Sequence, residues 1–391
     1  MAIINRIGEF HDDMTAWRHD LHAHPEIAFE EVRTSSFVAD KLKSFGLDEV
    51  HTGIAKTGVV GVLRNGSAGR AIGLRADMDA LPIVEATGLS YASKTPGRMH
   101  ACGHDGHTTM LLGAARYLAE TRNFDGTVVF IFQPAEENEG GGRVMIEEGL
   151  FERFPMERVF GMHNWPRMPL GQFAMRPGPV MAAADRFTIR LGGKGGHGAM
   201  PHVSRDPLVA AAQIVVALQT IVSREVDPVE SAVVTVTQIH GGDAYNVIPQ
   251  SALMTGTARS FQPAIRAMLE QRVRAITEGI GTTLGMSVEV DYEFGYPPTV
   301  NAELETEIAA AAATEIVGED RIDRAPPQVM GAEDFAFMLE KKPGSYIFIG
   351  NGGGDDAPMV HHPAYNFNDE ALPYGASYWA KLIERELPRT G

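Results

Sequence analysis

The chain has 391 residues, more than a single hydrophobic core usually organises, so we expect two domains. A hydrophobic content of 44% and a charged content of 21% are those of an ordinary globular protein. The formal net charge of -16, with no basic block, argues against nucleic acid and anionic membrane as partners.

Cysteine usage and apolar runs bear on the compartment. The single cysteine, Cys102, forbids a disulfide within the chain and fits a reducing environment. Residues 1–13 contain no apolar core of signal-peptide length. The longest apolar run, near 208–222, is interrupted by two glutamines and is too short to span a bilayer. We therefore expect a cytoplasmic protein without a membrane partner.

Apolar periodicity and β-branched runs predict the elements of the first half of the chain. The expected helices are 7–23, 29–45, 108–118 and 143–148. The expected strands are 59–63, 71–76, 127–132 and 159–162. Pro25 should end the first helix and Gly46 the second.

From Asp185 the pattern changes to that of a ferredoxin-like unit, β-α-β-β-α-β. Its strands are expected at 186–191, 231–239, 253–259 and 286–292, and its helices at 206–224 and 263–284. Asp206 is the expected N-cap of the first of these helices. The first domain then resumes with helices at 302–317 and 369–387, a short helix opened by 331–335 and a strand at 345–350. We therefore predict an α/β domain from residues 1–183 and 296–391, with an inserted α+β domain at 184–295.

Side chains that can bind metal are most concentrated in residues 99–107, M-H-A-C-G-H-D-G-H, directly before a predicted helix. Soft and borderline ligands close to a helix start indicate a metal site. Alternatives are a buried structural cysteine and a nucleophilic pair of Cys102 with His104. Two residues that lie two positions apart in a loop suit one metal site. They suit poorly a thiolate and a base that must face each other, so we favour metal binding.

More ligand-type side chains follow the predicted strands, where open α/β sheets place their ligands. Asp77 and Asp79 follow one strand, Glu136 and Glu137 the next, and His163 a third. The two aspartates either orient a metal-bound imidazole or form a turn with a helix cap, and their spacing favours neither. We interpret His19, His22 and His24 as structural or supporting residues. Glu333 and Asp334 either line the pocket or cap a helix, and we favour the cap.

Five candidate ligands exceed what one tetrahedral zinc needs. They are Cys102, His104, Glu137, His163 and one of His361 and His362. Such a set suits two metals that share a bridge, roughly 3.5–4 Å apart. It leaves one glutamate of the 136–137 pair beside metal-activated water, as a general base.

Seven motifs occur in order along essentially the whole chain. They are M-H-A-C-G-H-D-G-H, Q-P-A-E-E, M-H-N-W-P, G-G-H-G-A-M-P-H, N-V-I-P, G-A-E-D-F and V-H-H-P-A-Y-N-F-N-D-E. The series resembles the M20 metallopeptidase family, in its branch of hippurate hydrolases, N-acyl-amino-acid amidohydrolases and auxin-conjugate hydrolases. The resemblance implies a zinc-peptidase-like catalytic domain, with a mixed central sheet and helices on both faces, and an inserted ferredoxin-like domain.

The resemblance also implies roles for single residues. Two divalent metals, with Cys102 as their bridge, would be held by Cys102, His104, Glu137, His163 and His361. Glu136 matches the general base, and Asp79 matches the acid that supports the metal site. His197 matches a histidine that reaches into the partner subunit's site, and Asn246 and Arg259 match groups that hold substrate. Family members often carry Asn or Ser where this chain has a second imidazole, His362, so that residue's part stays open.

The implied reaction is hydrolysis of the amide bond of an N-acyl-amino acid to a carboxylate and a free amino acid. Glu136 would take the proton of a metal-activated water, and His197 would help to stabilise the oxyanion. Arg259 would bind the substrate's α-carboxylate. Thiolate favours zinc, while carboxylate and imidazole also admit manganese. The inserted domain would carry a dimer contact and close the site, so a homodimer or a higher homo-oligomer is expected.

Three other functions stay open from the sequence. They are an aminopeptidase or dipeptidase of the same family, a non-catalytic binding protein on this fold, and a hydrolase that uses Cys102 as nucleophile. An intact general base and ligand set argue against the second, and chelation would separate the third. Arg259 also fits a salt bridge on the inserted domain, and His197 a structural role in its loop. The acyl group, the amino acid, the native metal and the open or closed state of that domain are not readable from sequence.

Overall fold

The computed structural model describes residues 3–389. The chain forms two compact units, each with its own hydrophobic core. Unit 1 is Met1–Gly178, Val300–Pro327 and Asp334–Gly391, and unit 2 is Pro179–Thr299 and Gln328–Glu333. Two short strands, β7 (Gly178–Met181) and β14 (Thr299–Asn301), lie where the chain passes from one unit to the other.

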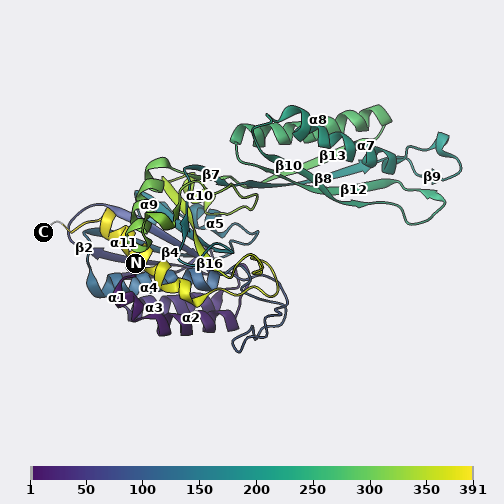
Figure 1. Ribbon diagram of the computed structural model, residues 1–391. Helices are drawn as coiled ribbons and strands as arrows, with labels where there is room; N and C mark the ends of the chain where they lie inside the picture. The colour runs from purple at the N-terminus through teal and green to yellow at the C-terminus, as the bar shows by residue number, and fades with distance from the viewer. Residues whose placement is uncertain (1–2, 390–391) are drawn as a thin grey trace. The chain divides into compact units, whose positions relative to one another are not determined.

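Unit 1 is built on an eight-stranded mixed sheet in the order β1-β2-β4-β3-β5-β16-β6-β15 (Figure 1). Its strands are β1 (Glu49–Ile54), β2 (Gly58–Asn65), β3 (Ala71–Asp77), β4 (Gly126–Gln133), β5 (Arg158–Pro166), β6 (Phe173–Ala174), β15 (Ile322–Asp323) and β16 (Gly344–Gly352). The four central strands β4, β3, β5 and β16 are parallel, and β1 and β2 are antiparallel to their neighbours. The carboxyl ends of the parallel strands therefore meet at one edge of the sheet.

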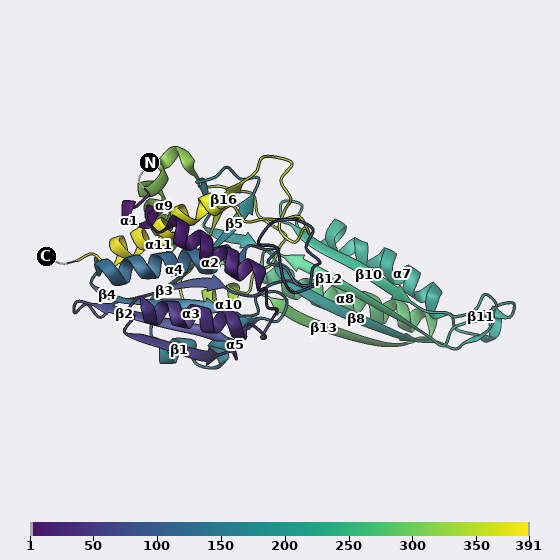
Figure 2. The same ribbon diagram turned by 90° about the horizontal axis from the view of Figure 1, so that it is seen from below.

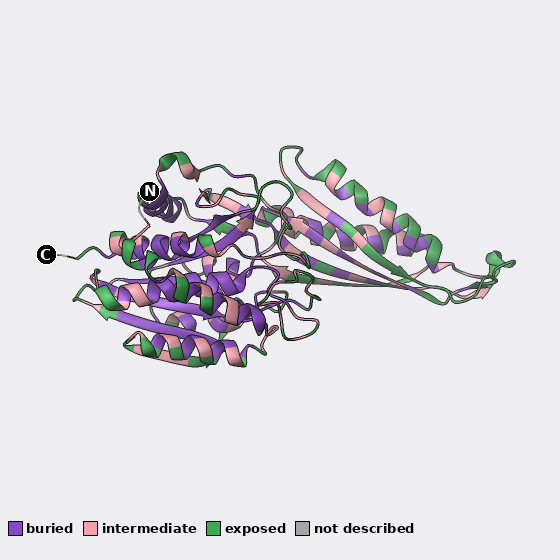
Figure 3. Ribbon diagram, turned by 60° about the horizontal axis from the view of Figure 1, so that its bottom comes forward, coloured by how far each residue is buried: buried purple, intermediate pink, exposed green. Residues whose placement is uncertain are grey.

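Helices cover both faces of this sheet. They are α1 (Asn5–Gly8), α2 (His11–Ala23), α3 (Val32–Ser44), α4 (His104–Thr121), α5 (Gly141–Glu147), α6 (Leu150–Arg153), α9 (Glu303–Val317), α10 (Ala336–Leu339) and α11 (Leu372–Glu386). The crossovers β3-α4-β4 and β4-α5-β5 run in opposite directions along the sheet. Because such crossovers are right-handed, α4 and α5 lie on opposite faces. Figure 3 shows the central strands and α4 as largely buried.

The start of α4 differs from the sequence prediction. A start is expected at residue 108, but the helix begins at His104. Gly103 precedes it with φ +90°, a backbone conformation that glycine adopts without strain. This turn places His104, Asp105 and His107 in the first two turns of the helix rather than in a loop.

Unit 2 is a four-stranded antiparallel sheet in the order β10-β12-β8-β13, with two long helices on one face (Figure 2). Its main elements are β8 (Ala183–Gly192), α7 (Pro207–Thr220), β10 (Ala232–His240), β12 (Ser251–Ser260), α8 (Pro263–Leu284) and β13 (Ser287–Tyr296). Their order is the predicted ferredoxin-like one. The Asp206 side chain accepts a hydrogen bond from the Leu208 backbone N–H at 2.9 Å, which confirms it as the N-cap of α7.

One helical stretch of the described chain, Pro207–Glu225, is long and apolar enough to cross a membrane by length and composition. It comprises α7 and a π-helical turn, Ile221–Glu225. Its side chains Ala210, Ile214 and Leu218 lie in the core of unit 2. The apolar character of this helix is therefore accounted for in part by packing against the sheet.

Candidate metal centre

The parallel strands of unit 1 bring the ligand-type side chains to one edge of the sheet. β3 ends at Asp77, two residues before Asp79, and β4 ends three residues before Glu136. His163 lies near the end of β5, and His104 opens α4. The expectation that strand ends collect these residues therefore agrees with the topology.

Of the groups of ligand-type side chains that form there, three overlapping ones contain two or more of the predicted ligands. The groups are Cys102–His104–His163, Cys102–Glu137–His361 and His104–Glu136–Glu137, each with its ligand atoms within 4.8 Å of one another. Cys102 Sγ lies 3.3 Å from His163 Nε2, and His361 Nε2 lies 3.0 Å from Glu137 Oε1. The structure thus brings together the five predicted ligands and Glu136.

The donor set fits divalent cations. Thiolate, imidazole and carboxylate are the ligands of zinc, and the last two also bind manganese. His104 Nδ1 lies 3.2 Å from Asp79 Oδ1, while its Nε2 is buried without a hydrogen-bond partner among the described residues. A carboxylate that holds one ring nitrogen and leaves the other free is the usual support of a metal-bound histidine.

The electrostatics of the site also call for positive charge. Burial and the Glu137 and Glu136 carboxylates raise the pKa of the Cys102 thiol well above its usual range. Burial lowers the pKa of His104, but Asp77 and Asp79 outweigh it and raise that pKa to about 10. A buried cluster of acids is costly without a compensating cation.

The two aspartates at the end of β3 have separate hydrogen-bond partners, although Asp77 Oδ2 also lies 3.8 Å from His104 Nε2. Asp79 holds His104 with one oxygen and accepts the Glu137 backbone N–H at 2.9 Å with the other. Asp77 instead lies 2.7 Å from His107 Nδ1 and accepts a hydrogen bond of 2.7 Å from Arg75. Of the two roles that the spacing left open, Asp79 supports the imidazole of a candidate ligand, whereas the imidazole that Asp77 holds, His107, is not a predicted ligand.

Glu136 is buried in a tightly held turn. The preceding Ala135 has φ +55°, and its N–H donates to Glu31 Oε1 at 2.9 Å. The backbone N–H of Asp334 lies 3.4 Å from Glu136 Oε1. Burial raises the pKa of Glu31 to about 7, although a hydrogen bond from Thr57 opposes the shift. The turn therefore presents Glu136 from a constrained backbone.

Asp334 corrects one interpretation of the sequence. It is not the cap of a helix, because α10 has no side-chain cap. Its carboxylate accepts hydrogen bonds in the interior from Arg75, Gln133 and the Gly142 backbone N–H at 2.7–3.0 Å. A buried arginine in β3 needs such an acceptor, and the sequence spacing of more than two hundred residues conceals the pair.

The two adjacent histidines near the C-terminus differ in their surroundings. His361 has φ +68°, donates its backbone N–H to Ala101 at 2.7 Å and faces Glu137. His362 accepts a hydrogen bond from the Ala364 backbone N–H at 3.0 Å and belongs to no ligand group of residues 3–389. The geometry therefore favours His361 as the ligand.

Unit 2 carries the other predicted site residues at two separate places. His197 and Asn246 lie together, because β9 (Gly196–His197) pairs with β11 (Val247–Ile248) and the Gly198 N–H donates to Asn246 O at 2.7 Å. Arg259 is the ninth residue of β12, at the opposite end of the sheet. At the rise of an extended strand, about 25 Å or more separates it from the β9–β11 pair.

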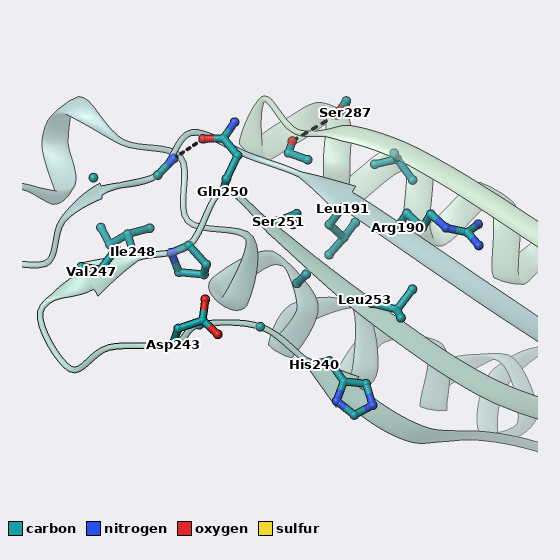
Figure 4. A pocket seen from close by; sticks show the side chains of 18 of the residues that line it. Arg190, Leu191, His240, Asp243, Val247, Ile248, Gln250, Ser251, Leu253 and Ser287 are labelled. Carbon is teal, nitrogen blue, oxygen red and sulfur yellow. Dashed lines mark hydrogen bonds between the residues drawn. The ribbon is translucent and has the colours of Figure 1, made fainter.

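An open pocket lies beside that pair (Figure 4). In its wall Gln250 accepts a hydrogen bond from the Gly195 N–H at 3.0 Å and donates one to Gly193 O at 2.9 Å. These bonds fasten the segment that carries His197 to the sheet of unit 2. The lining of the pocket does not include His197, Asn246 or Arg259.

The sequence model of Peptidase family M20/M25/M40 matches residues 73–385, which is most of the chain. The chain belongs to this family. The family that the motifs indicated from the sequence is thereby confirmed.

The M20 chain is similar to several named relatives over nearly its full length. It is 43% identical to hippurate hydrolase of Campylobacter jejuni over 99% of this chain and 100% of that one. It is 40% identical to N-acetylcysteine deacetylase of Bacillus subtilis, covering 95% of this chain and 96% of that one. It is also 40% identical to an IAA-amino acid hydrolase of Arabidopsis thaliana, covering 97% and 87%.

A solved structure confirms the predicted fold class of this M20 protein. The YXEP protein of Bacillus subtilis, described as a dinuclear metal binding peptidase from the M20 family, has a TM-score of 0.85. It is 37% identical, and the similarity covers 97% of this chain and 99% of that one.

Several residues that surround the candidate ligands have no predicted role in the sequence analysis. Glu31 falls within the predicted helix 29–45, and Asn164 and Tyr365 belong to motifs without a role of their own. His107 was counted among the imidazoles without a role. Asn164 is next to a candidate ligand in the sequence, which is a signal for its place in the site. Glu31 and Tyr365 reach the site from distant segments, so only the folded structure reveals them.

Proposed function

We propose that this protein is a binuclear metal-dependent amidohydrolase that cleaves N-acyl-amino acids to a carboxylate and a free amino acid. The observation that carries the proposal is the position of Glu136, a buried carboxylate within 4.8 Å of two ligands, His104 and Glu137. A carboxylate at that place suits proton transfer to and from a reacting water. The names of the relatives, which include a hippurate hydrolase and a deacetylase, support the substrate class.

The proposed ligands divide between two cations. His104 and His163 lie with Cys102 in one group, and Glu137 and His361 lie with Cys102 in another, so Cys102 is the proposed bridge. When bound, two divalent cations, zinc or manganese, lower the pKa of a water and polarise a substrate carbonyl.

The side chains around the ligands prepare Glu136 for its role. Glu136 takes a proton from the attacking water and later gives it to the leaving amine. The Asp334 backbone N–H orients its carboxylate, and Asp79 keeps the His104 ring in place. Each of these contacts exists before substrate arrives, so the groups need little reorganisation during the reaction.

Arg259 is the proposed partner of the substrate's α-carboxylate. It lies on the face of β12 opposite the buried Ala258 and Ser260, and no hydrogen bond or ion pair joins its guanidinium to another described residue, although the Asp185 carboxylate is near enough to act on its charge. Burial and the neighbouring Arg186 lower the pKa of its guanidinium, so an anion would relieve an unfavourable environment. This absence of a partner argues against the salt-bridge alternative.

We further propose a homodimer in which His197 acts at the partner's site. One substrate is too small to touch both Arg259 and the β9–β11 pair of the same unit 2, about 25 Å away. β10 is an edge strand with an exposed backbone edge, and α7 beside it exposes Val209 and Val216. An unpaired edge next to exposed apolar side chains is a suitable surface for a second copy.

A mixture of two inactive variants tests the exchange of His197. Glu136→Gln and His197→Ala chains should each lose activity alone. After subunit exchange at equal amounts, about one quarter of wild-type activity should return, because half of the dimers are hybrids with one intact site. Activity of the mixture is measured before and after exchange. No recovery, with hybrids demonstrated by mass, would place His197 at its own chain's site or outside catalysis.

Metal content and substrate preference test the proposed function as a whole. The purified chain should hold about two metals, and chelation should abolish hydrolysis of benzoyl-glycine or N-acetyl amino acids until zinc or manganese is restored. The same panel includes free dipeptides and tripeptides. Faster cleavage of these would favour an aminopeptidase or dipeptidase. Turnover that survives complete chelation would contradict the metal mechanism and favour Cys102 as nucleophile.

A further inference from the structure

One buried residue contacts the two segments that carry the proposed ligands Cys102 and His163. Asn164 follows His163 in β5 and is fully buried. We propose that Asn164 is a positioning residue that sets Cys102 against His163 and so preorganises the metal centre. This inference rests on the proposed function, because the two residues matter as a pair only if they are ligands.

The contacts of Asn164 reach both ligands directly. Its side-chain Nδ2 donates to the Cys102 carbonyl oxygen at 2.7 Å. The backbone carbonyl oxygen of Asn164 lies 2.6 Å from His163 Nδ1, and Nε2 of that ring therefore faces the Cys102 thiol. One residue therefore holds the backbone of one ligand and the ring of the other.

The orientation of Asn164 is itself determined by its neighbours. The Tyr365 hydroxyl donates to Asn164 Oδ1 at 2.7 Å, while Nδ2 of the same amide donates to the Cys102 carbonyl. The Cys102 carbonyl oxygen can only accept, so the amide must present Nδ2 to it. A flipped amide would leave that carbonyl without its donor in the interior, which is costly.

His107 fixes the backbone of the same residue. The Asn164 backbone N–H points at His107 Nε2 at 2.9 Å, and since a backbone N–H always donates, Nε2 must be the acceptor. The proton of the ring is then on Nδ1, which lies 2.7 Å from Asp77. Arg75 holds that carboxylate in turn, at 2.7 Å. These residues form a continuous buried row from β3 to β5.

Gly103 packs against this row from the ligand loop. A Cβ atom on Gly103 would lie 2.3 Å from Asn164 Nδ2 and 2.5 Å from the Tyr365 hydroxyl, and the residue has φ +90°. The turn between Cys102 and His104 therefore closes directly onto Asn164. Close packing and hydrogen bonds together define where the thiol lies.

Cobalt(II) titration of the metal-stripped full-length chain tests this role without relying on activity. Asn164→Asp keeps the size of the side chain but replaces the donor to the Cys102 carbonyl with an acceptor. We expect the affinity for cobalt to fall about 10–100-fold, as for other residues that orient ligands. The thiolate-to-cobalt charge-transfer band should weaken as well, because the thiol is displaced.

Two further variants complete the design. Asn301→Asp is the matched control, since Asn301 is also buried and donates to the Arg176 and Tyr346 carbonyls but touches no ligand segment. It should keep wild-type cobalt affinity. Tyr365→Phe removes only the hydroxyl that holds Asn164, and it should weaken cobalt binding in the same direction by less.

The outcomes separate the inference from the proposed function. A folded Asn164→Asp chain with wild-type affinity and an unchanged band would overturn the inference, as would an equal loss in Asn301→Asp. If Asn164→Asp does not fold, Tyr365→Phe decides, and unaltered cobalt binding there has the same meaning. A wild-type chain that takes up no cobalt would instead contradict the proposed metal centre itself.

Discussion

Glu136→Gln is expected to reduce kcat by about 10²–10⁴-fold while the chain keeps its full complement of metal, because only the proton-transfer group is lost. Glutamine has the same shape, and its carbonyl oxygen can still accept the Asp334 backbone N–H. The ligands beside it are held independently, His104 by Asp79 and Glu137 through its backbone N–H. Steady-state kinetics and elemental analysis on the same sample give the two readouts.

Glu139→Gln is the matched control for this substitution. Glu139 lies in the same segment after β4, but it is exposed and belongs to no ligand group of the described chain. It undergoes the same change of charge and should retain wild-type kinetics. A Glu136→Gln chain that keeps most of its turnover would refute the general-base role. Loss of metal from it would reassign Glu136 as a ligand.

Part of the candidate site was predictable because several of its side chains lie close to the ends of parallel strands. Apolar runs identify β3, β4 and β5, and the acids and the imidazole close to their ends, Asp79, Glu136 and His163, are legible in the sequence. The period of the helices and strands of unit 2 is equally clear. In unit 1 the central strands are predicted, but β1 and the short strands β6 and β15 are not.

The residues that sequence reasoning missed act through contacts between distant segments. Tyr365 holds Asn164 across two hundred residues, and Asp334 meets Arg75 across a still longer separation. Hydrophobic periodicity carries no information about such pairs. The early start of α4 was concealed for a different reason, since a positive φ at Gly103 makes a turn into the first helical residue where the spacing reads as loop.

Substitution of Cys102 is expected to have the second large effect, on both metal content and turnover. Cys102→Ala should lower the metal content from about two per chain to below one and abolish turnover, because the thiol belongs to both ligand groups. By contrast, His361→Ala removes a member of one group only and should leave about one metal behind. Elemental analysis after dialysis against metal-free buffer distinguishes the two variants.

The comparison of these two variants tests the bridge rather than mere ligation. If Cys102 bound a single cation, its loss and that of His361 would leave equal amounts of metal. A Cys102→Ala chain that retained two metals but no activity would instead indicate a covalent role for the thiol. That outcome would conflict with the geometry, since burial and two neighbouring carboxylates hold the pKa of the thiol high, which opposes a free thiolate nucleophile. Cations held by Cys102 with His163 on one side and with Glu137 on the other would compensate these negative charges. The acidic surroundings that disfavour a free nucleophile would therefore favour a metal ligand.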